Sequence, residues 1–151
     1  MPRPGVVIVH DYLTQRGGAE RVVLSMLKAF PRAEVITSFY LSEATFPEFG
    51  AYPIRVLPIN RWSVLRRNHR FALPFLASAF ARERIDADVV LCSSSGWAHG
   101  VRTRGRKVVY CHTPARWLYQ PERYAGRSIA SRAAIAVLRP RLLEWDRRSA
   151  A

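Results

Sequence analysis

The stretch GVVIVHDYLTQRGGAER, at residues 5–21, decides the fold class of this chain. It opens with an apolar run ending at His10 that lacks the polar alternation of a half-exposed strand, so we expect a strand buried on both faces. A polar loop follows, and Gly17 and Gly18 lead into a segment whose apolar residues recur at helical spacing. A buried strand, a glycine-containing loop and a helix in this order predict the first βα unit of a parallel sheet.

Further runs of β-branched residues predict the other strands. The runs at residues 87–92 and 107–111 have the same character as the first, at residues 5–10, and we expect them also to be buried on both faces. Two weaker candidates lie at residues 33–39 and 54–57. These five segments would form one sheet.

Helical spacing of apolar residues fills the gaps between the strands. The first helix is predicted over residues 18–30, where a following proline ends it. Residues 61–84 have a helical pattern, but Pro74 should either break it into two helices or begin a second one. Residues 128–149 also have a helical pattern, and Pro140 predicts a kink.

Strands that alternate with helices and are apolar on both faces predict an α/β fold: a Rossmann-like open, mostly parallel sheet with helices on both faces. The length of 151 residues and the 49% hydrophobic composition suffice for one such domain over residues 1–151. In folds of this kind the ligand lies outside the carboxyl ends of the strands, so the loops after His10, Cys92 and His112 should converge on one crevice.

Arginine dominates the charge of the chain. The formal net charge is +13, from 24 basic and 11 acidic residues. Such a surface attracts nucleic acid, anionic lipid headgroups and phosphorylated substrates, and charge alone does not choose among them. No run approaches the roughly 18 apolar residues of a membrane span, and no signal-peptide pattern is present, so we expect a cytoplasmic protein.

The two cysteines, Cys92 and Cys111, each end an apolar run, and we expect two reduced thiols in the core. A metal site would need further cysteine ligands at a suitable spacing, and the sequence lacks them. We therefore expect no metal.

The paired glycines suggest a phosphate-binding loop. Without Cβ atoms, Gly17 and Gly18 would let a ligand approach the backbone, and the free N–H groups at a helix start favour a diphosphate. The spacing matches neither the dinucleotide-binding pattern nor a Walker loop. The alternative is a tight turn from strand to helix, with Glu20 merely complementing the helix dipole.

Two polar segments follow the later strands. His112 ends a strand before an X-Pro turn, where it could contact a sugar hydroxyl or stabilise a developing charge, with Arg116 as an anion clamp. A histidine at a strand end can equally be structural. The serine run at 93–95 could contact an acceptor through Ser94, or could serve only as a helix cap and turn.

Residues 60–71 interleave arginines with aromatic and aliphatic side chains. Basic residues there can engage anionic headgroups while Trp62, Leu65 and Phe71 enter the interfacial layer. The alternative is an arginine-rich solvated face over an ordinary core helix. The residues assigned to membrane contact are Arg61, Trp62, Arg66, Arg67 and Arg70.

The segments His-Asp-Tyr-Leu at 10–13, Gly-Gly-Ala-Glu-Arg at 17–21, Ser-Ser-Ser at 93–95 and Cys-His-Thr-Pro-Ala-Arg-Trp at 111–117 together resemble family 4 glycosyltransferases. The resemblance covers nearly the whole chain and is closest to mannosyltransferase-like enzymes of bacterial polysaccharide assembly. It implies the two-domain GT-B architecture, a nucleotide-sugar donor, metal-independent chemistry and retention of anomeric configuration.

The resemblance also implies roles for individual residues. Gly17 and Gly18 would approach the donor diphosphate, and His112 would contact the transferred, mannose-like sugar near its reacting carbon. The acceptor, a polysaccharide or a lipid-linked glycan, would be contacted by Asp11, Ser94 and Arg116.

The family's second domain holds most of the nucleotide pocket and two donor-binding glutamates, and no residue of this sequence corresponds to them. We therefore expect an acceptor-side half that is inactive without its C-terminal partner domain, located in the cytoplasm and peripherally at the inner face of the membrane.

One alternative is a non-catalytic membrane-binding or acceptor-binding subunit of a split enzyme. A basic nucleic-acid-binding domain is another, but the arginines are dispersed and no nucleic-acid motif is present, so we expect no nucleic-acid partner.

Overall fold

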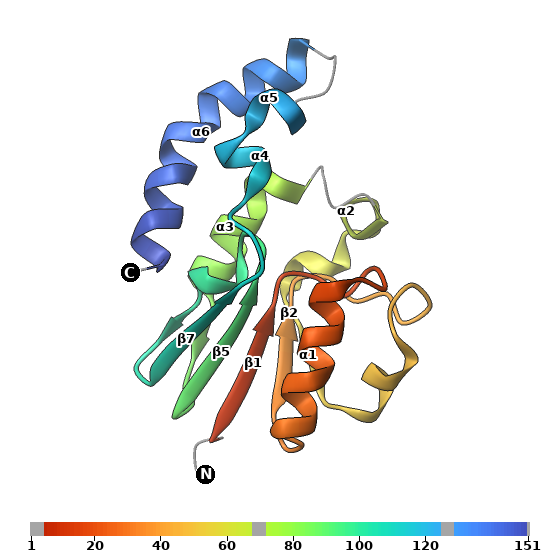
Figure 1. The fold of residues 1–151 in the computed structure, drawn as a ribbon. Helices are drawn as coiled ribbons and strands as arrows, with labels where there is room; N and C mark the ends of the chain where they lie inside the picture. Colours follow the sequence, from red (N-terminus) through yellow and green to blue (C-terminus); the bar gives the residue numbers. More distant parts are fainter. Residues whose placement is uncertain (1–4, 68–71, 125–128, 151) are drawn as a thin grey trace.

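The computed structural model describes residues 5–67, 72–124 and 129–150. Its centre is a five-stranded sheet in the order β3-β2-β1-β5-β7, and every neighbouring pair in that sheet is parallel (Figure 1). This confirms the predicted Rossmann-like open parallel α/β fold. The strands are β1 (Val6–His10), β2 (Glu34–Thr37), β3 (Ile54–Val56), β5 (Val89–Ser94) and β7 (Arg106–Cys111).

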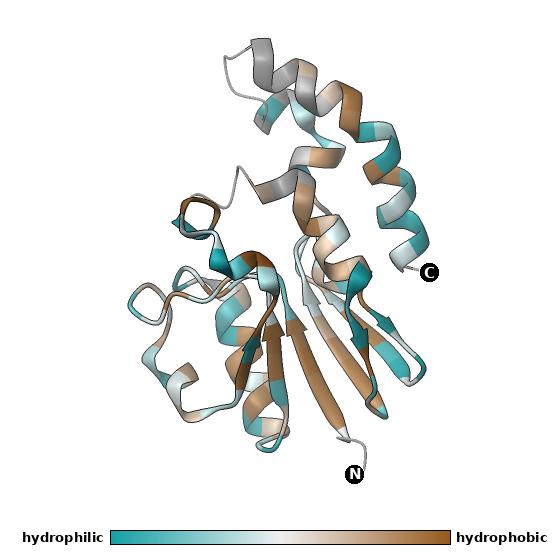
Figure 2. Ribbon diagram, turned by 180° about the vertical axis from the view of Figure 1, so that it is seen from behind, coloured by the Kyte–Doolittle hydropathy of each residue, from teal (hydrophilic) through white to brown (hydrophobic). Residues whose placement is uncertain are grey.

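Helices cover both faces of the sheet, as predicted (Figure 1). On one face, Val23 and Leu27 of α1 (Gly18–Ala29) pack with Ile8 in one core cluster. On the other face, α3 (Leu73–Arg82) and α6 (Ile129–Ala150) pack against a second cluster. Because side chains alternate along a strand, each central strand contributes to both clusters. The central strands are therefore hydrophobic along their length, as their brown colour in Figure 2 shows.

Strand β7 is only partly covered, and here the prediction of burial on both faces was wrong. Val108 is 41% exposed and Tyr110 is 51% exposed. The reason is position: β7 is one of the two outer strands of the sheet, and α1 lies beside β1 and β2 on the face to which these side chains point (Figure 1). An apolar run predicts a strand, but it does not tell an edge strand from a central one.

The two cysteines differ for the same reason. Cys92 on β5 is fully buried, and burial raises the pKa of its thiol to about 12, so it is an uncharged core residue. Cys111 at the end of β7 is exposed, which corrects the expectation of two core thiols.

The sequence predicted that Pro74 and Pro140 would each affect a helical segment. The predicted 61–84 segment contains two helices, α2 (Ser63–Arg67) and α3, and Pro74 lies in the first turn of α3, where its missing N–H costs nothing. Helix α6 continues through Pro140. None of the described helices is both long and apolar enough to span a bilayer.

Short elements complete the chain. A second, two-stranded sheet pairs β4 (Arg84–Ile85) with β6 (Arg102–Thr103). Two short helices, α4 (Arg116–Tyr119) and α5 (Pro121–Tyr124), lead from the sheet towards α6. The described residues include the 3-10 turns η1 (Pro47–Ala51), η2 (Pro58–Arg61) and η4 (Ala98–Gly100).

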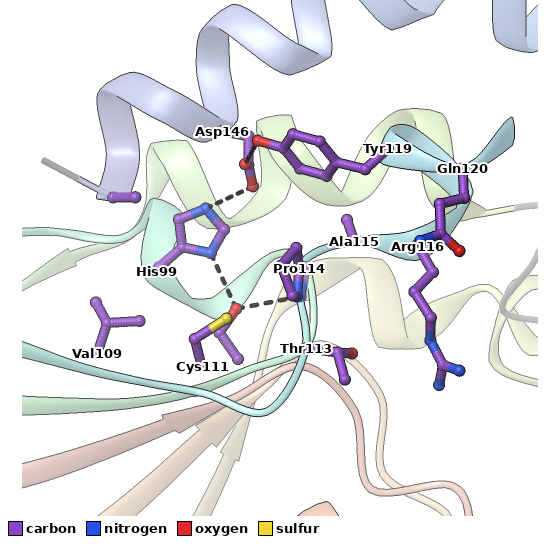
Figure 3. A pocket seen from close by; sticks show the side chains of 13 residues that line it. His99, Val109, Cys111, Thr113, Pro114, Ala115, Arg116, Tyr119, Gln120 and Asp146 are labelled. Atoms are coloured by element: carbon purple, nitrogen blue, oxygen red, sulfur yellow. Dashed lines mark hydrogen bonds and ion pairs between the residues drawn. The ribbon is translucent and has the colours of Figure 1, made fainter.

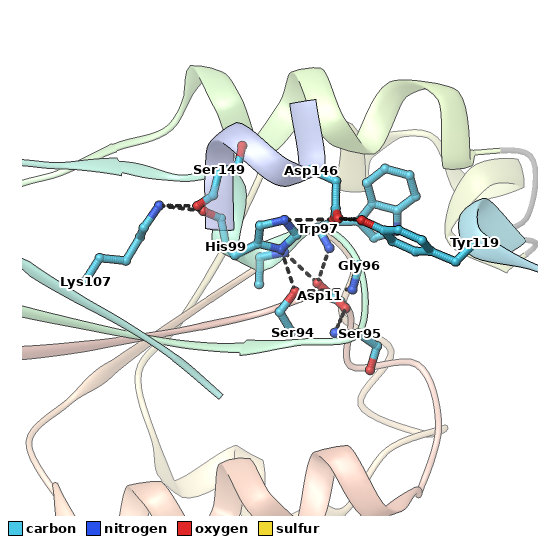
Figure 4. Close-up of polar contacts among 11 residues, drawn as sticks. Asp11, Ser94, Ser95, Gly96, Trp97, His99, Lys107, Tyr119, Asp146 and Ser149 are labelled. Carbon is cyan, nitrogen blue, oxygen red and sulfur yellow. Dashed lines mark hydrogen bonds and ion pairs between the residues drawn. The ribbon is translucent and has the colours of Figure 1, made fainter. Parts of the chain in front are cut away.

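The C-terminal part of α6 is fastened to η4. The Trp145 ring packs against Trp97 and His99, with ring centroids 5.8 Å and 5.2 Å apart. Lys107 adds hydrogen bonds from Nζ to the carbonyl oxygens of His99 (3.0 Å) and Ser149 (2.7 Å), which Figure 4 shows. These contacts hold the C-terminal part of α6 against η4 and β7.

Gly100 makes this packing possible, because a Cβ atom there would collide with the Trp145 ring. We expect Gly100→Ala to lower the free energy of unfolding by about 1–3 kcal/mol, the range for overpacking. The measurement is urea denaturation of the purified chain. Gly50→Ala is the matched control, since nothing lies within 4 Å of its Cβ position; equal effects of the two substitutions would contradict the assignment.

Candidate functional site

The loops that leave β1, β5 and β7 meet at the carboxyl ends of the strands, as the parallel topology predicts. His10 is in register with Ser93, and Ser94 is in register with Cys111. The backbone N–H of His112 continues this pairing with a 2.9 Å hydrogen bond to the Ser94 carbonyl. Polar residues from three strand ends therefore lie next to one another at the carboxyl ends of the strands.

A buried carboxylate joins two of these loops. Asp11 is 2% exposed, and its carboxylate accepts backbone N–H bonds from Ser95 (2.6 Å), Trp97 (3.0 Å) and Ala98 (2.6 Å), as Figure 4 shows. We expected Asp11 to contact an acceptor. In the structure its carboxylate points into the protein and holds the loop after β5 in place.

Ser94 belongs to a second group of polar contacts, which also includes His99 and Asp146. Its hydroxyl accepts a bond from the Gly96 N–H (3.2 Å) and lies 2.9 Å from Nδ1 of His99. On the other side of the ring, Nε2 lies 3.1 Å from Oδ1 of Asp146 on α6. Burial raises the pKa of Asp146, but hydrogen bonds from His99 and Tyr119 outweigh it, so this pKa lies below its ordinary value and the carboxylate is ionised.

A cavity of about 510 Å³ lies beside this group, between the end of β7, α4 and α6 (Figure 3). Ser94 and Arg116, two of the residues expected at an acceptor, both line it. The Arg116 side chain is exposed at its rim. The remaining lining residues are Gly96, His99, Val109, Cys111, Thr113, Pro114, Ala115, Tyr119, Gln120, Asp146 and Ala150.

His112 lies on the opposite face of the sheet from Ser94. It is half-buried, its ring is 5.0 Å from the ring of Tyr110, and its Nε2 is 2.8 Å from the Ser93 hydroxyl. Burial lowers the pKa of His112, the nearby His10 lowers it further, and the carboxylates of Asp11 and Glu20 oppose this only in part. The imidazole is therefore neutral at neutral pH.

Two buried residues near His112, His10 and Glu20, were not predicted from the sequence as part of the site. His10 and Glu20 are 2% and 1% exposed, and His10 Nε2 lies 3.7 Å from Glu20 Oε1. Burial raises the pKa of Glu20, but its polar contact with His10 and other contacts outweigh this, and the net shift is downward. A signal was present in the sequence, because a histidine ends an otherwise apolar strand at His10.

The two glycines of the loop differ in their surroundings. The Gly17 N–H donates to Glu20 Oε2 at 2.9 Å, and a Cβ atom at residue 17 would lie 2.6 Å from that oxygen. A Cβ atom at Gly18 would meet nothing within 4 Å. A side chain at residue 17 would therefore displace the Glu20 carboxylate, whereas Gly18 borders open space at the first turn of α1.

The arginine-rich segment is exposed around α2. Arg61 and Arg67 are exposed, Trp62 is 68% exposed, and Arg66 is partly buried, with a bond from Nη1 to the Asn60 carbonyl. Leu65 packs against the core, so it does not face solvent as expected. Val64 does instead, at 66% exposure. Arg70, Phe71 and the side chain of Trp117 lie outside the described residues.

No protein family, curated protein or solved structure matched the chain when it was compared with each of them. Within residues 5–67, 72–124 and 129–150, no group of three or more histidine, cysteine or acidic side chains could hold a metal ion. The site is therefore interpreted from its own geometry.

We expect Asp11→Asn to lower the free energy of unfolding by about 2–4 kcal/mol, because the amide group would face backbone donors and the charge that strengthens these bonds is lost. Chemical denaturation measures this. Asp88→Asn is the control, since Asp88 is exposed, and it should change stability by less than about 0.5 kcal/mol. A tolerated Asp11→Asn substitution would show that the loop is held by other contacts.

Proposed function

We propose that this chain is the acceptor-side domain of a retaining glycosyltransferase, which transfers a mannose-like hexose from a nucleotide sugar to a polysaccharide or lipid-linked acceptor. The observation that carries the proposal is the placement of His112 at the same sheet edge as the glycine loop and the cavity. A nucleotide-sugar reaction needs three such regions: one for the diphosphate, one for the sugar and one for the acceptor.

The diphosphate is assigned to the start of α1. Gly18 has open space above it, and a helix start attracts anions through its free N–H groups and its dipole. The Gly17 N–H already bonds to Glu20, so the role of Gly17 is to shape the loop. His112 then contacts the transferred sugar, and its neutral ring adds no charge beside the diphosphate.

The acceptor is assigned to the cavity beside β7. Hydroxyl, amide and guanidinium groups from Thr113, Gln120 and Arg116 line it, and such groups bind sugar hydroxyls. Ser94 also lines the cavity, and Asp11 acts indirectly by holding the loop that follows Ser94.

Retention suits a same-face reaction. The bond from the anomeric carbon to the donor phosphate breaks, the acceptor oxygen bonds to the same face, and the acceptor proton passes to the departing phosphate. In such a reaction the protein supplies position and electrostatic stabilisation. A second, donor-binding domain would supply the rest of the nucleotide pocket.

In a protein that joins this chain to its donor-binding domain, we expect His112→Ala to lower kcat by roughly 10²–10³-fold. The ring is half-buried, so the free energy of unfolding should fall by only about 1 kcal/mol. The measurement is the rate of nucleoside diphosphate release from a nucleotide sugar in the presence of glycan acceptor, with urea denaturation as the control. Activity near that of the unaltered protein would remove His112 from the site.

The exposed segment around α2 favours a second role at an anionic membrane. Trp62 and Val64 project into solvent beside Arg61 and Arg67, so apolar and basic groups can contact lipid together. We propose that this surface places the domain peripherally at the cytoplasmic leaflet. A split enzyme whose membrane-binding subunit is this chain would use the same surface without any catalysis.

We expect the double substitution Trp62→Ser with Val64→Ser to weaken binding to phosphatidylglycerol vesicles about tenfold or more, because both apolar side chains leave the lipid. Co-sedimentation measures the bound fraction. Val137→Ser on α6 is the control, since Val137 is 76% exposed and lies on a different element. Binding to oligonucleotides but not to these vesicles would instead favour a nucleic-acid-binding domain.

A further inference from the structure

A continuous line of polar contacts runs behind His112. Glu20 Oε1 lies 3.7 Å from His10 Nε2, and His10 Nδ1 lies 3.1 Å from the carbonyl oxygen and 3.0 Å from the hydroxyl oxygen of Ser93. The same hydroxyl lies 2.8 Å from His112 Nε2. At the far end, Glu20 Oε2 accepts the Gly17 N–H, so the line reaches the glycine loop.

The strand register explains why these residues meet. His10 on β1 is paired with Ser93 on β5, which is paired with Tyr110 on β7. Paired residues of a parallel sheet point to the same face, and His112, two residues after Tyr110, continues that alternation. The contact line is therefore built into the sheet.

The protonation of His10 follows from its neighbours. A carbonyl oxygen can only accept a hydrogen bond, so the Ser93 carbonyl requires a proton on His10 Nδ1. The Glu20 carboxylate lies 3.7 Å from His10 Nε2, and both residues are almost fully buried. The proton on His10 Nδ1 is therefore fixed by the Ser93 carbonyl.

The direction of the next bond follows in turn. The His10 Nδ1–H points at both Ser93 oxygens, so the Ser93 hydroxyl oxygen accepts from it. That hydroxyl has a single proton, which is left for the remaining neighbour, His112 Nε2. His112 Nε2 is then the acceptor, and the proton of its neutral ring is on Nδ1.

We propose that Ser93, held by the buried side chains of His10 and Glu20, fixes His112 in the Nδ1–H tautomer, so that His112 offers a hydrogen-bond donor to its ligand. Among the described residues, Nδ1 of His112 has no hydrogen-bond partner. A donor here suits an acceptor oxygen such as a sugar hydroxyl or a phosphate oxygen. The same arrangement means that His112 is not a general base, since its lone pair is directed at Ser93.

Ser93, His10 and Glu20 are positioning residues in this scheme. The oxygen that receives the His112 proton depends on the proposed transferase function, whereas the position of the proton does not. The tautomer can therefore be tested without any nucleotide sugar.

The test is heteronuclear NMR of the imidazole nitrogens in the isotopically labelled chain, which distinguishes Nδ1–H, Nε2–H and doubly protonated rings. The four histidines can be assigned with single His→Gln variants. At a pH where His112 is neutral, we expect its Nδ1–H pattern to predominate, with a proton on Nδ1 of His10. An Nε2–H pattern for His112 would overturn the proposal.

The Ser93→Ala variant removes the donor, and we expect His112 to lose the Nδ1–H pattern and take the Nε2–H form that an isolated imidazole prefers. Ser94→Ala is the matched control: it is the adjacent serine, but its hydroxyl bonds to His99 on the other face, so the His112 pattern should persist. An unchanged His112 pattern in Ser93→Ala would also overturn the proposal. Should Ser93→Ala not fold, the tautomer of the unaltered chain still decides the question.

In the complete transferase, Ser93→Ala should lower kcat roughly tenfold or more, with little change in KM, as is typical when a group that orients a site residue is removed. A protein with the expected tautomer but no transfer from any nucleotide sugar would contradict the proposed function alone. Transfer activity with the Nε2–H tautomer would contradict this inference alone.

Discussion

Three backbone N–H groups donate to the Asp11 carboxylate and fix the loop after β5 at the carboxyl ends of the strands. Parallel strands bring their loops to one edge, but loops have no ladder of hydrogen bonds to fix them. The Asp11 carboxylate supplies that fixed point from the end of β1. The loop it fixes carries His99, which contacts Asp146 of α6, so the shape of the cavity depends on one buried charge.

The alternation of β5 divides the polar residues into two separate groups. Ser93 faces the α1 side and joins the line of contacts to His112, whereas Ser94 faces the α6 side and joins His99 at the cavity. Two adjacent serines of identical chemistry thus have different neighbours. A slip of one residue in the pairing of β1 with β5 would turn each serine to the opposite face and break both groups.

Much of the fold could be predicted from the sequence because its signals are local. The apolar run before His10 and the proline at residue 74 predict a buried strand and a helix start without any knowledge of the rest of the chain. The exposure of β7 could not be predicted, since it depends on which strand occupies the edge. The His10–Glu20 pair and the inward turn of Asp11 likewise arise from contacts between distant segments, so the candidate site was found only in part.

The open edge of β7 has a consequence for the behaviour of the domain in solution. An edge strand has unpaired N–H and C=O groups on one side, and Val108 and Tyr110 add exposed apolar surface to them, a combination that promotes intermolecular strand pairing and aggregation. Arg106 and Lys107 begin the same strand. Charged side chains on an edge strand oppose pairing with another chain, so these two cations limit self-association through β7.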